Sequence, residues 1–215
     1  MKNKILLPTM LFSVFSVLVL SEGFTAYAKG KPSPVVPTPI PNSICIDPGH
    51  GGSEPGAING DLIEKNVNLE VAKMLRDKLL DSGSYTVFMT RDTDVYLTNA
   101  DRYNFCNLMN AEILISIHHN GSEDPGINYS TAFYMKRSDV ALAQEVVNTV
   151  SSTLGLTNKG ISRFASGVLL KSVMPATISE GFFLTSSAEY ENIANSDRLE
   201  QEADALFVAI TNYLK

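Results

Sequence analysis

Histidine and cysteine are scarce in this sequence, which has three histidines and two cysteines among 215 residues. Cys45 and Cys106 are too isolated to form a close-spaced Cys/His zinc motif, so cysteine ligation of a metal is not expected. The sequence also has no excess of positive charge, because its formal net charge is −6. We therefore expect no nucleic-acid partner and weak attraction to anionic membranes.

A long apolar run is missing as well, although the N-terminus is hydrophobic. Lys2 and Lys4 precede a largely apolar stretch, residues 5–20, which is shorter than the about 20 residues of a membrane span. Ala26-Tyr27-Ala28 matches the small-x-small pattern of a cleavage site. We predict a signal peptide over residues 1–28, with an uncleaved N-terminal anchor as the alternative. The mature protein would be exported to the periplasm or the cell wall, without stable membrane insertion.

Residues 29–42 are rich in proline, which favours an extended polyproline II linker and cannot build a core. Residues 43–215 are long enough for one domain with a substantial core. Export permits a disulfide, but a domain of this size does not require one. For Cys45 and Cys106 we favour two buried free thiols over a bridge.

Apolar runs with strand character alternate with helical patterns along this domain. We expect strands at residues 43–47, 85–90, 113–118, 132–135, 168–170 and 176–180, and helices at 64–80, 98–109, 138–154 and 198–214. In the second helix, Asp101 and Arg102 are expected to be exposed. This alternation predicts an α/β fold, with a mostly parallel central sheet flanked by helices on both faces in a single domain.

All three histidines lie at or just after the ends of predicted strands. His50 lies just after the first strand, in Asp47-Pro48-Gly49-His50-Gly51-Gly52, whereas His118 and His119 end the third. Ligands bind at the carboxyl ends of the strands in parallel sheets, so these side chains can converge there. The alternative is that each histidine is an ordinary core or surface residue.

Two carboxylates are predicted near the same edge. Glu64 opens the first helix, where it could join two histidines as a zinc ligand. From its position alone, it could equally be an acid favoured by the helix dipole. Glu180 ends a nearly uncharged strand, and partial burial would raise its pKa and suit it to proton transfer.

Five segments in order resemble the N-acetylmuramoyl-L-alanine amidase family, type 3. They are Asp47-Pro48-Gly49-His50-Gly51-Gly52, Glu64-Lys65-Asn66-Val67-Asn68-Leu69, Thr90-Arg91-Asp92-Thr93-Asp94, Ser116-Ile117-His118-His119-Asn120, and Met174-Pro175-Ala176 leading to Glu180. The resemblance spans residues 44–214. It implies a zinc-dependent hydrolase that cleaves the amide bond between N-acetylmuramic acid and L-alanine in peptidoglycan.

The resemblance also assigns roles to individual residues. It implies that His50, Glu64 and His118 bind Zn²⁺ and that Glu180 is the catalytic carboxylate. Arg91, Arg102 and Asn120 occupy family-typical positions, for which we favour a structural role over substrate contact. His119 replaces a small residue of the family pattern, and we expect it at the rim of the site or in contact with substrate. Two further departures are Phe182, where the family has glycine, and Ser186, where it has asparagine.

Two other functions fit the same motifs. One is a zinc peptidase or carboxypeptidase acting on the peptidoglycan stem peptide, and the other is a wall-binding module with an inactive site. Between His118 and Glu180 the sequence shows no additional helix of the kind that blocks the zinc in regulated family members. We therefore expect a protein that is constitutively active or is controlled by an external activator protein. We also expect a monomer.

Overall fold

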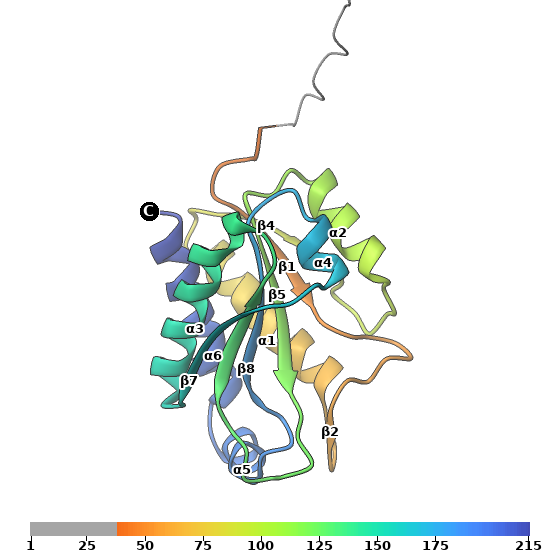
Figure 1. Cartoon of the computed structure of the whole chain (residues 1–215), viewed down its shortest axis with the longest axis vertical. Coiled ribbons are helices and arrows are strands. Elements are labelled where there is room, and N and C mark those ends of the chain that lie inside the picture. The colour runs from red at the N-terminus through yellow and green to blue at the C-terminus, as the bar shows by residue number, and fades with distance from the viewer. Residues whose placement is uncertain (1–37) are drawn as a thin grey trace, which may run out of the picture. The chain divides into compact units, whose positions relative to one another are not determined.

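The computed structural model describes residues 38–215, so the predicted signal peptide and most of the proline-rich linker lie outside the described residues. A six-stranded sheet forms the centre of this region (Figure 1). Its strands are β1 (Ser43–Pro48), β4 (Thr86–Met89), β5 (Ile113–Asn120), β6 (Ser130–Tyr134), β7 (Asn158–Arg163) and β8 (Ala176–Phe183). A small separate hairpin pairs β2 (Ile58–Asn59) with β3 (Leu62–Ile63).

The strand order is β4-β1-β5-β8-β6-β7. Neighbouring strands are parallel except β6 and β8, which are antiparallel. The central strands β1 and β5 are nearly continuous apolar runs, as expected for strands buried on both faces. The predicted α/β fold with a mostly parallel sheet is confirmed.

Helices cover both faces of the sheet (Figure 1). They are α1 (Glu64–Asp81), α2 (Asn99–Leu108), α3 (Val140–Leu154), α4 (Gly167–Lys171), α5 (Ser187–Asn195) and α6 (Arg198–Tyr213), with a 3₁₀ turn at Arg137–Asp139. One core cluster joins α1, α3 and α6 to Ile44 and Ile46, whereas another joins α2 and α4 to Cys45. Successive β1 side chains thus enter opposite layers, as the pleat of a strand requires.

The strand predicted at residues 168–170 is wrong. This segment is part of α4, whose N-cap Ser166 accepts a hydrogen bond from the backbone N–H of Val168. A three-residue apolar run has no periodicity to distinguish a strand from a helix. Strand β7, helix α5 and the β2–β3 hairpin were not predicted, because their sequences lack strong hydrophobic patterns.

Cys45 and Cys106 form a disulfide, so the preference for free thiols is wrong. The bond joins β1 to α2 across 61 residues of sequence. Both cysteines are fully buried in the same core cluster. Their pairing depends on how α2 packs on the sheet, which the local sequence does not reveal.

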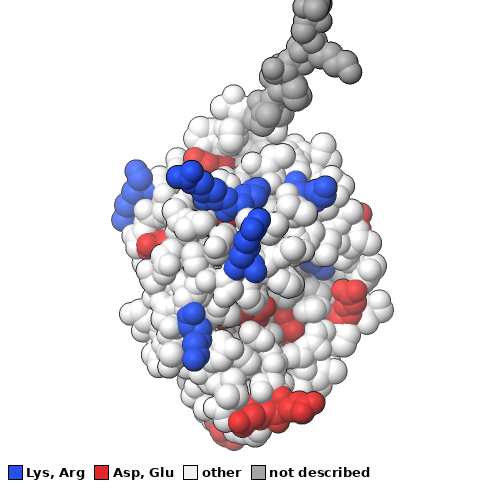
Figure 2. Space-filling model, viewed as in Figure 1, with Lys and Arg blue, Asp and Glu red and all other residues white. Residues whose placement is uncertain are grey.

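Charge is unevenly distributed over the surface shown in Figure 2. On this face, lysine and arginine side chains lie mainly over the upper half, whereas acidic side chains are more frequent in the lower half. The face therefore carries both signs of charge rather than a continuous basic surface. Among residues 38–215, no helix combines the length and apolar character needed to cross a membrane.

Candidate metal and catalytic site

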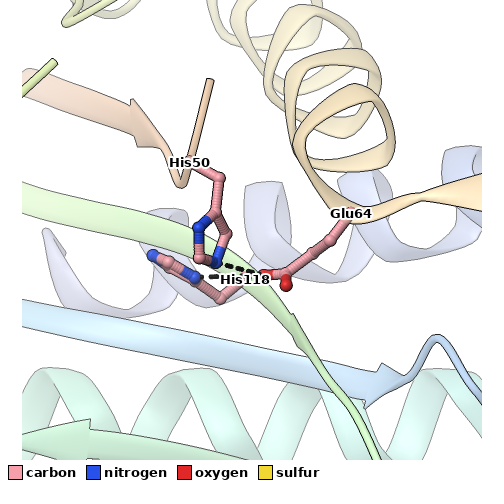
Figure 3. Close-up of side chains that lie close together, drawn as sticks. All are labelled: His50, Glu64 and His118. Atoms are coloured by element: carbon pink, nitrogen blue, oxygen red, sulfur yellow. Dashed lines mark hydrogen bonds and ion pairs between the residues drawn. The ribbon is translucent and has the colours of Figure 1, made fainter. Parts of the chain in front are cut away.

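Three separate segments bring His50, Glu64 and His118 together at the carboxyl edge of the sheet. His50 follows β1, Glu64 begins α1, and His118 lies near the end of β5 (Figure 3). Glu64 Oε1 is 3.2 Å from His50 Nε2 and 3.1 Å from His118 Nδ1. One potential ligand atom from each residue lies within 4.8 Å of the other two. The predicted convergence of these residues is therefore observed.

Glycines allow the backbone to approach this cluster closely. A Cβ atom on Gly49 would lie 2.3 Å from the His118 ring, and one on Gly56 would lie 2.3 Å from Glu64 Oε2. Gly56 also has a φ of +71°, which favours glycine. His50 itself has a φ of 58°, in the left-handed region that non-glycine residues rarely occupy. The loop thus has a defined, constrained backbone that directs the His50 ring toward Glu64.

Two buried arginines hold this loop. Arg91 donates hydrogen bonds to the carbonyl oxygens of Pro48 and Gly49 at 2.9 and 2.8 Å. Arg102 donates to the carbonyl oxygens of Pro48 and His50, each at 2.8 Å. The structural role expected for both arginines agrees with these contacts. The prediction that Arg102 is exposed is wrong, because it is buried beneath the loop.

The partner of Arg102 is Asp47, at 2.8 Å. This carboxylate is fully buried and also accepts hydrogen bonds from Thr90 at 2.6 Å and Ser116 at 2.7 Å. Burial alone would raise the pKa of Asp47, but the Arg102 charge and the three side-chain hydrogen bonds lower it. An ionised Asp47 therefore fixes Arg102, and through it the loop that carries His50.

The electrostatic environment keeps Glu64 ionised. Burial alone would raise its pKa, but hydrogen bonds and charge from His118 and His50 lower it well below the usual range. Its other oxygen, Oε2, accepts a hydrogen bond from the backbone N–H of Ala57 at 2.8 Å. Glu64 therefore presents one oriented carboxylate oxygen to the two imidazoles.

Glu180 lies beside this cluster. It is the register partner of His118 on the adjacent parallel strand β8, and both residues line the same cavity. Burial, together with the Glu64 charge, raises the pKa of Glu180 to about 7, although His118 and the other histidines lower it. Its Oε2 is buried without a hydrogen-bond partner. Such a carboxyl group can exchange protons near neutral pH.

The cavity in front of these residues has a volume of about 310 Å³. Apolar and polar side chains from α2, β6 and the segment around α4 form its other walls. The remaining lining residues include Asn99, Phe133, Phe164, Ser166, Val168 and Ile178. A partly apolar cavity next to convergent titratable groups is typical of an enzyme active site.

His119 is not at the rim of this cavity, so that prediction is wrong. It points to the opposite face of β5 from His118, as strand alternation requires, and is 2% exposed. Its ring contacts Asn68, Glu202 and Phe182. Burial alone would lower the pKa of His119, but the charge of Glu202 and their hydrogen bond raise it.

The other two departures from the family pattern are also buried residues. Phe182 is fully buried, and Ser186 is the buried residue that precedes α5. Asn120 caps the end of β5, where its side chain accepts a hydrogen bond from the Gly121 N–H.

Two residues near the site, Asn68 and Glu202, were not predicted from the sequence. Asn68 lies four residues after Glu64 on the same helix face, a spacing that could have revealed it. Glu202 approaches from α6, and no local pattern indicates this contact.

The described geometry defines a class of protein. An α/β sheet presents two histidines and a carboxylate at its carboxyl edge, a donor set typical of metal-dependent hydrolases. The model of the N-acetylmuramoyl-L-alanine amidase family matches residues 44–212. The chain therefore belongs to this family.

Individual relatives agree with this assignment. The chain is 29% identical over 180 residues to the N-acetylmuramoyl-L-alanine amidase LytC of Bacillus subtilis (strain 168), covering 82% of this chain but 36% of LytC. The N-acetylmuramoyl-L-alanine amidase from Clostridium difficile 630 has a TM-score of 0.76 and 32% identity, covering 81% of this chain and 97% of that one. The CwlD amidase from Clostridioides difficile, solved in complex with the GerS lipoprotein, has a TM-score of 0.69 and 28% identity, covering 80% and 98%. The chain thus spans about a third of LytC and nearly all of the two solved structures.

Proposed function

We propose that this protein is an exported, zinc-dependent N-acetylmuramoyl-L-alanine amidase. In this proposal, His50, Glu64 and His118 bind the zinc ion, and Glu180 is the catalytic carboxylate. The single observation that carries it is the convergence of these three potential ligands beside a carboxyl group with a pKa of about 7. Family membership supplies the substrate: the amide bond between N-acetylmuramic acid and L-alanine in peptidoglycan.

The residues present fit a zinc ion. Two imidazole nitrogens and one carboxylate oxygen are a common ligand set for catalytic zinc, which leaves a position for water. The cluster faces a cavity that Glu180 also lines. The buried, unpartnered Oε2 of Glu180 marks a polar group available for a reacting molecule.

Glu180 would carry out the proton transfers of hydrolysis. A bound zinc ion would supply Lewis acidity, which activates water and polarises the substrate carbonyl. Ionised Glu180 accepts a proton from the attacking water, and the C–N bond then breaks as Glu180 returns this proton to the departing alanine amine. The products are a free stem peptide and a glycan strand without that peptide.

Product analysis tests the proposal. Purified peptidoglycan is incubated with the protein as isolated, after treatment with a chelator, and after zinc is restored. We expect mass spectrometry to find intact stem peptides with a free L-alanine N-terminus, lost with chelation and recovered with zinc. Shortened peptides still attached to the glycan would instead identify a peptidase or carboxypeptidase. Wall binding without any product would identify an inactive binding module.

We propose that the mature chain is a monomer that acts outside the cytoplasmic membrane, and that an external protein could activate it. The second idea is supported by CwlD, a structural neighbour solved in complex with the GerS lipoprotein. Size-exclusion chromatography with light scattering tests the monomer, and a mass above that of one chain would contradict it.

A further inference from the structure

Two departures from the family pattern contact each other in the folded protein. The rings of His119 and Phe182 have centroids 4.2 Å apart. Phe182 belongs to the core cluster formed with α1, α3 and α6, and His119 contacts Asn68 on α1 and Glu202 on α6, on the side of the sheet opposite the cavity. His119 therefore belongs to a buried polar group directly behind the candidate metal site.

Both ring nitrogens of His119 have partners. Nε2 lies 2.8 Å from Glu202 Oε2, and Nδ1 lies 2.7 Å from Asn68 Oδ1. The side chains of His119 and Glu202 are completely buried. A Cβ on Gly181 would lie 2.1 Å from Glu202 Oε1, so glycine at this position leaves the room that the carboxylate occupies.

The Asn68 amide connects this pair to the metal site. Its Nδ2 group donates to the Gly49 carbonyl oxygen at 3.1 Å and to Glu64 Oε1 at 3.3 Å. With both amide hydrogens used in this way, Oδ1 must face His119 and accept a hydrogen bond from Nδ1. A flipped amide would place two acceptors, Oδ1 and the Gly49 oxygen, against each other.

A second connection is direct. The backbone N–H of His119 donates to Glu64 Oε1 at 3.2 Å. Glu64 is thus held by His119 and Asn68 from behind, while Gly49, which precedes His50, is held by the same Asn68 amide. The group therefore contacts two of the three segments that form the candidate metal site.

We propose that His119, anchored by Glu202, is a positioning residue that orients Asn68 and thereby fixes Glu64 and the His50 loop for metal binding. This inference rests on the proposed zinc site. Partners that orient metal ligands typically change metal affinity by about 10- to 100-fold when they are removed. The Nδ1–H donor of His119 is the specific feature that the proposal requires.

Two substitutions of His119 test the roles of its two ring nitrogens separately. In His119→Asn, the shorter side chain can place an amide N–H near the Nδ1 position, where it can still donate to Asn68. In His119→Gln, the longer side chain places its amide near the Nε2 position, toward Glu202. Both are made in a Glu202→Gln background, so that no carboxylate is left buried without its charged partner.

Zinc affinity is measured by competition with a chromophoric chelator, and folding by urea denaturation of the metal-free protein. We expect His119→Asn to bind zinc within about threefold of the Glu202→Gln background. We expect His119→Gln to bind about 10- to 100-fold more weakly. The visible absorption spectrum of the Co²⁺-loaded His119→Gln variant should differ from that of the Glu202→Gln background more than the spectrum of the His119→Asn variant does.

Val71→Ala is the matched control for lost stability. Val71 is a buried core residue on α1, one turn after Asn68. This variant should unfold more easily yet bind zinc as the wild type does.

Several results would overturn the inference. Equal zinc affinity in the two His119 variants would show that the Nδ1–H donor is unimportant. Affinity that follows the free energy of unfolding, with Val71→Ala also impaired, would reduce His119 to an ordinary core residue. Failure of the wild type to bind zinc would overturn the proposed function itself, and this inference with it.

Discussion

His118 and Glu180 are register partners on the adjacent parallel strands β5 and β8. Their side chains therefore leave the same face of the sheet and line the same cavity. This arrangement places a candidate metal ligand next to a carboxyl group without any specialised loop. The roles of the two glutamates as metal ligand and proton carrier are also separate, because Glu64 contacts His50 and His118 directly, whereas Glu180 has an unpartnered oxygen.

Replacing Glu180 with glutamine should reveal its role in proton transfer. Glu180→Gln keeps the shape of the side chain but cannot accept a proton, so we expect kcat to fall by about 10²- to 10⁴-fold. The release of stem peptides from purified peptidoglycan measures this change. Zinc content should be unaltered, since Glu180 is outside the proposed ligand set. Glu70→Gln, an exposed substitution on α1, is the control. Retention of near-wild-type kcat by Glu180→Gln would exclude this residue as the catalytic carboxylate.

The pH dependence of the reaction should report the same carboxyl group. Glu180 must be ionised to accept the proton from water, and its pKa is raised to about 7. The value of kcat/KM should therefore rise with pH through a midpoint at or below 7, since a bound cation nearby favours the ionised form. Circular dichroism at each pH checks that the protein remains folded. A rate that is flat between pH 5 and 8 would contradict this assignment.

Gly49→Ala should disturb the candidate metal site without changing any proposed ligand. The added methyl group would lie 2.3 Å from the His118 ring, so the ring or the loop must move. We expect zinc affinity to fall by at least about 10-fold, by analogy with the loss of an orienting contact. Gly83→Ala provides a control, because no atom lies within 4 Å of the added carbon there. Gly83 has a φ of +67°, so this control carries backbone strain but lies far from the site in sequence. Unchanged zinc binding by Gly49→Ala would argue against His118 as a ligand.

The site could be predicted from the sequence where a general rule of topology applies. Parallel strands place their carboxyl ends at one edge, so residues that follow β1 and end β5 and β8 were expected to meet. Strand alternation likewise explains why His118 and His119 point to opposite faces. Neither rule indicated that Glu202 on α6 would be buried and paired with His119, because that contact depends on the packing of a helix distant in sequence.

The errors have the same physical origin. Arg102 was expected to be exposed because arginine usually is, yet it lies on the same face of α2 as Cys106, which is bonded to β1. Its burial is stabilised by Asp47 and two backbone carbonyl groups, which belong to a strand and a loop about 50 residues away. Such contacts become visible only when the tertiary arrangement is known.

The Asp47–Arg102 pair offers a stability test with a defined pH dependence. Arg102→Leu leaves a buried carboxylate without its cation, which typically costs about 3–5 kcal/mol at neutral pH. In the wild type, the pKa of Asp47 is lowered, so its stabilising effect is present at neutral pH and is lost only as the pH falls through that low pKa. Without Arg102, burial should instead raise the pKa of Asp47. Protonation of Asp47 should then restore part of the stability of the variant as the pH falls.

The difference in unfolding free energy between wild type and Arg102→Leu should therefore be largest near pH 7 and shrink toward pH 4. Urea denaturation at several pH values measures it, and the double variant Asp47→Asn/Arg102→Leu should regain part of the loss at pH 7 because no buried charge remains. Both variants should also bind zinc more weakly than the wild type, since Arg102 holds the carbonyl oxygen of His50. A stability difference that is independent of pH would show that Asp47 is not ionised in the folded protein, and that packing alone retains Arg102.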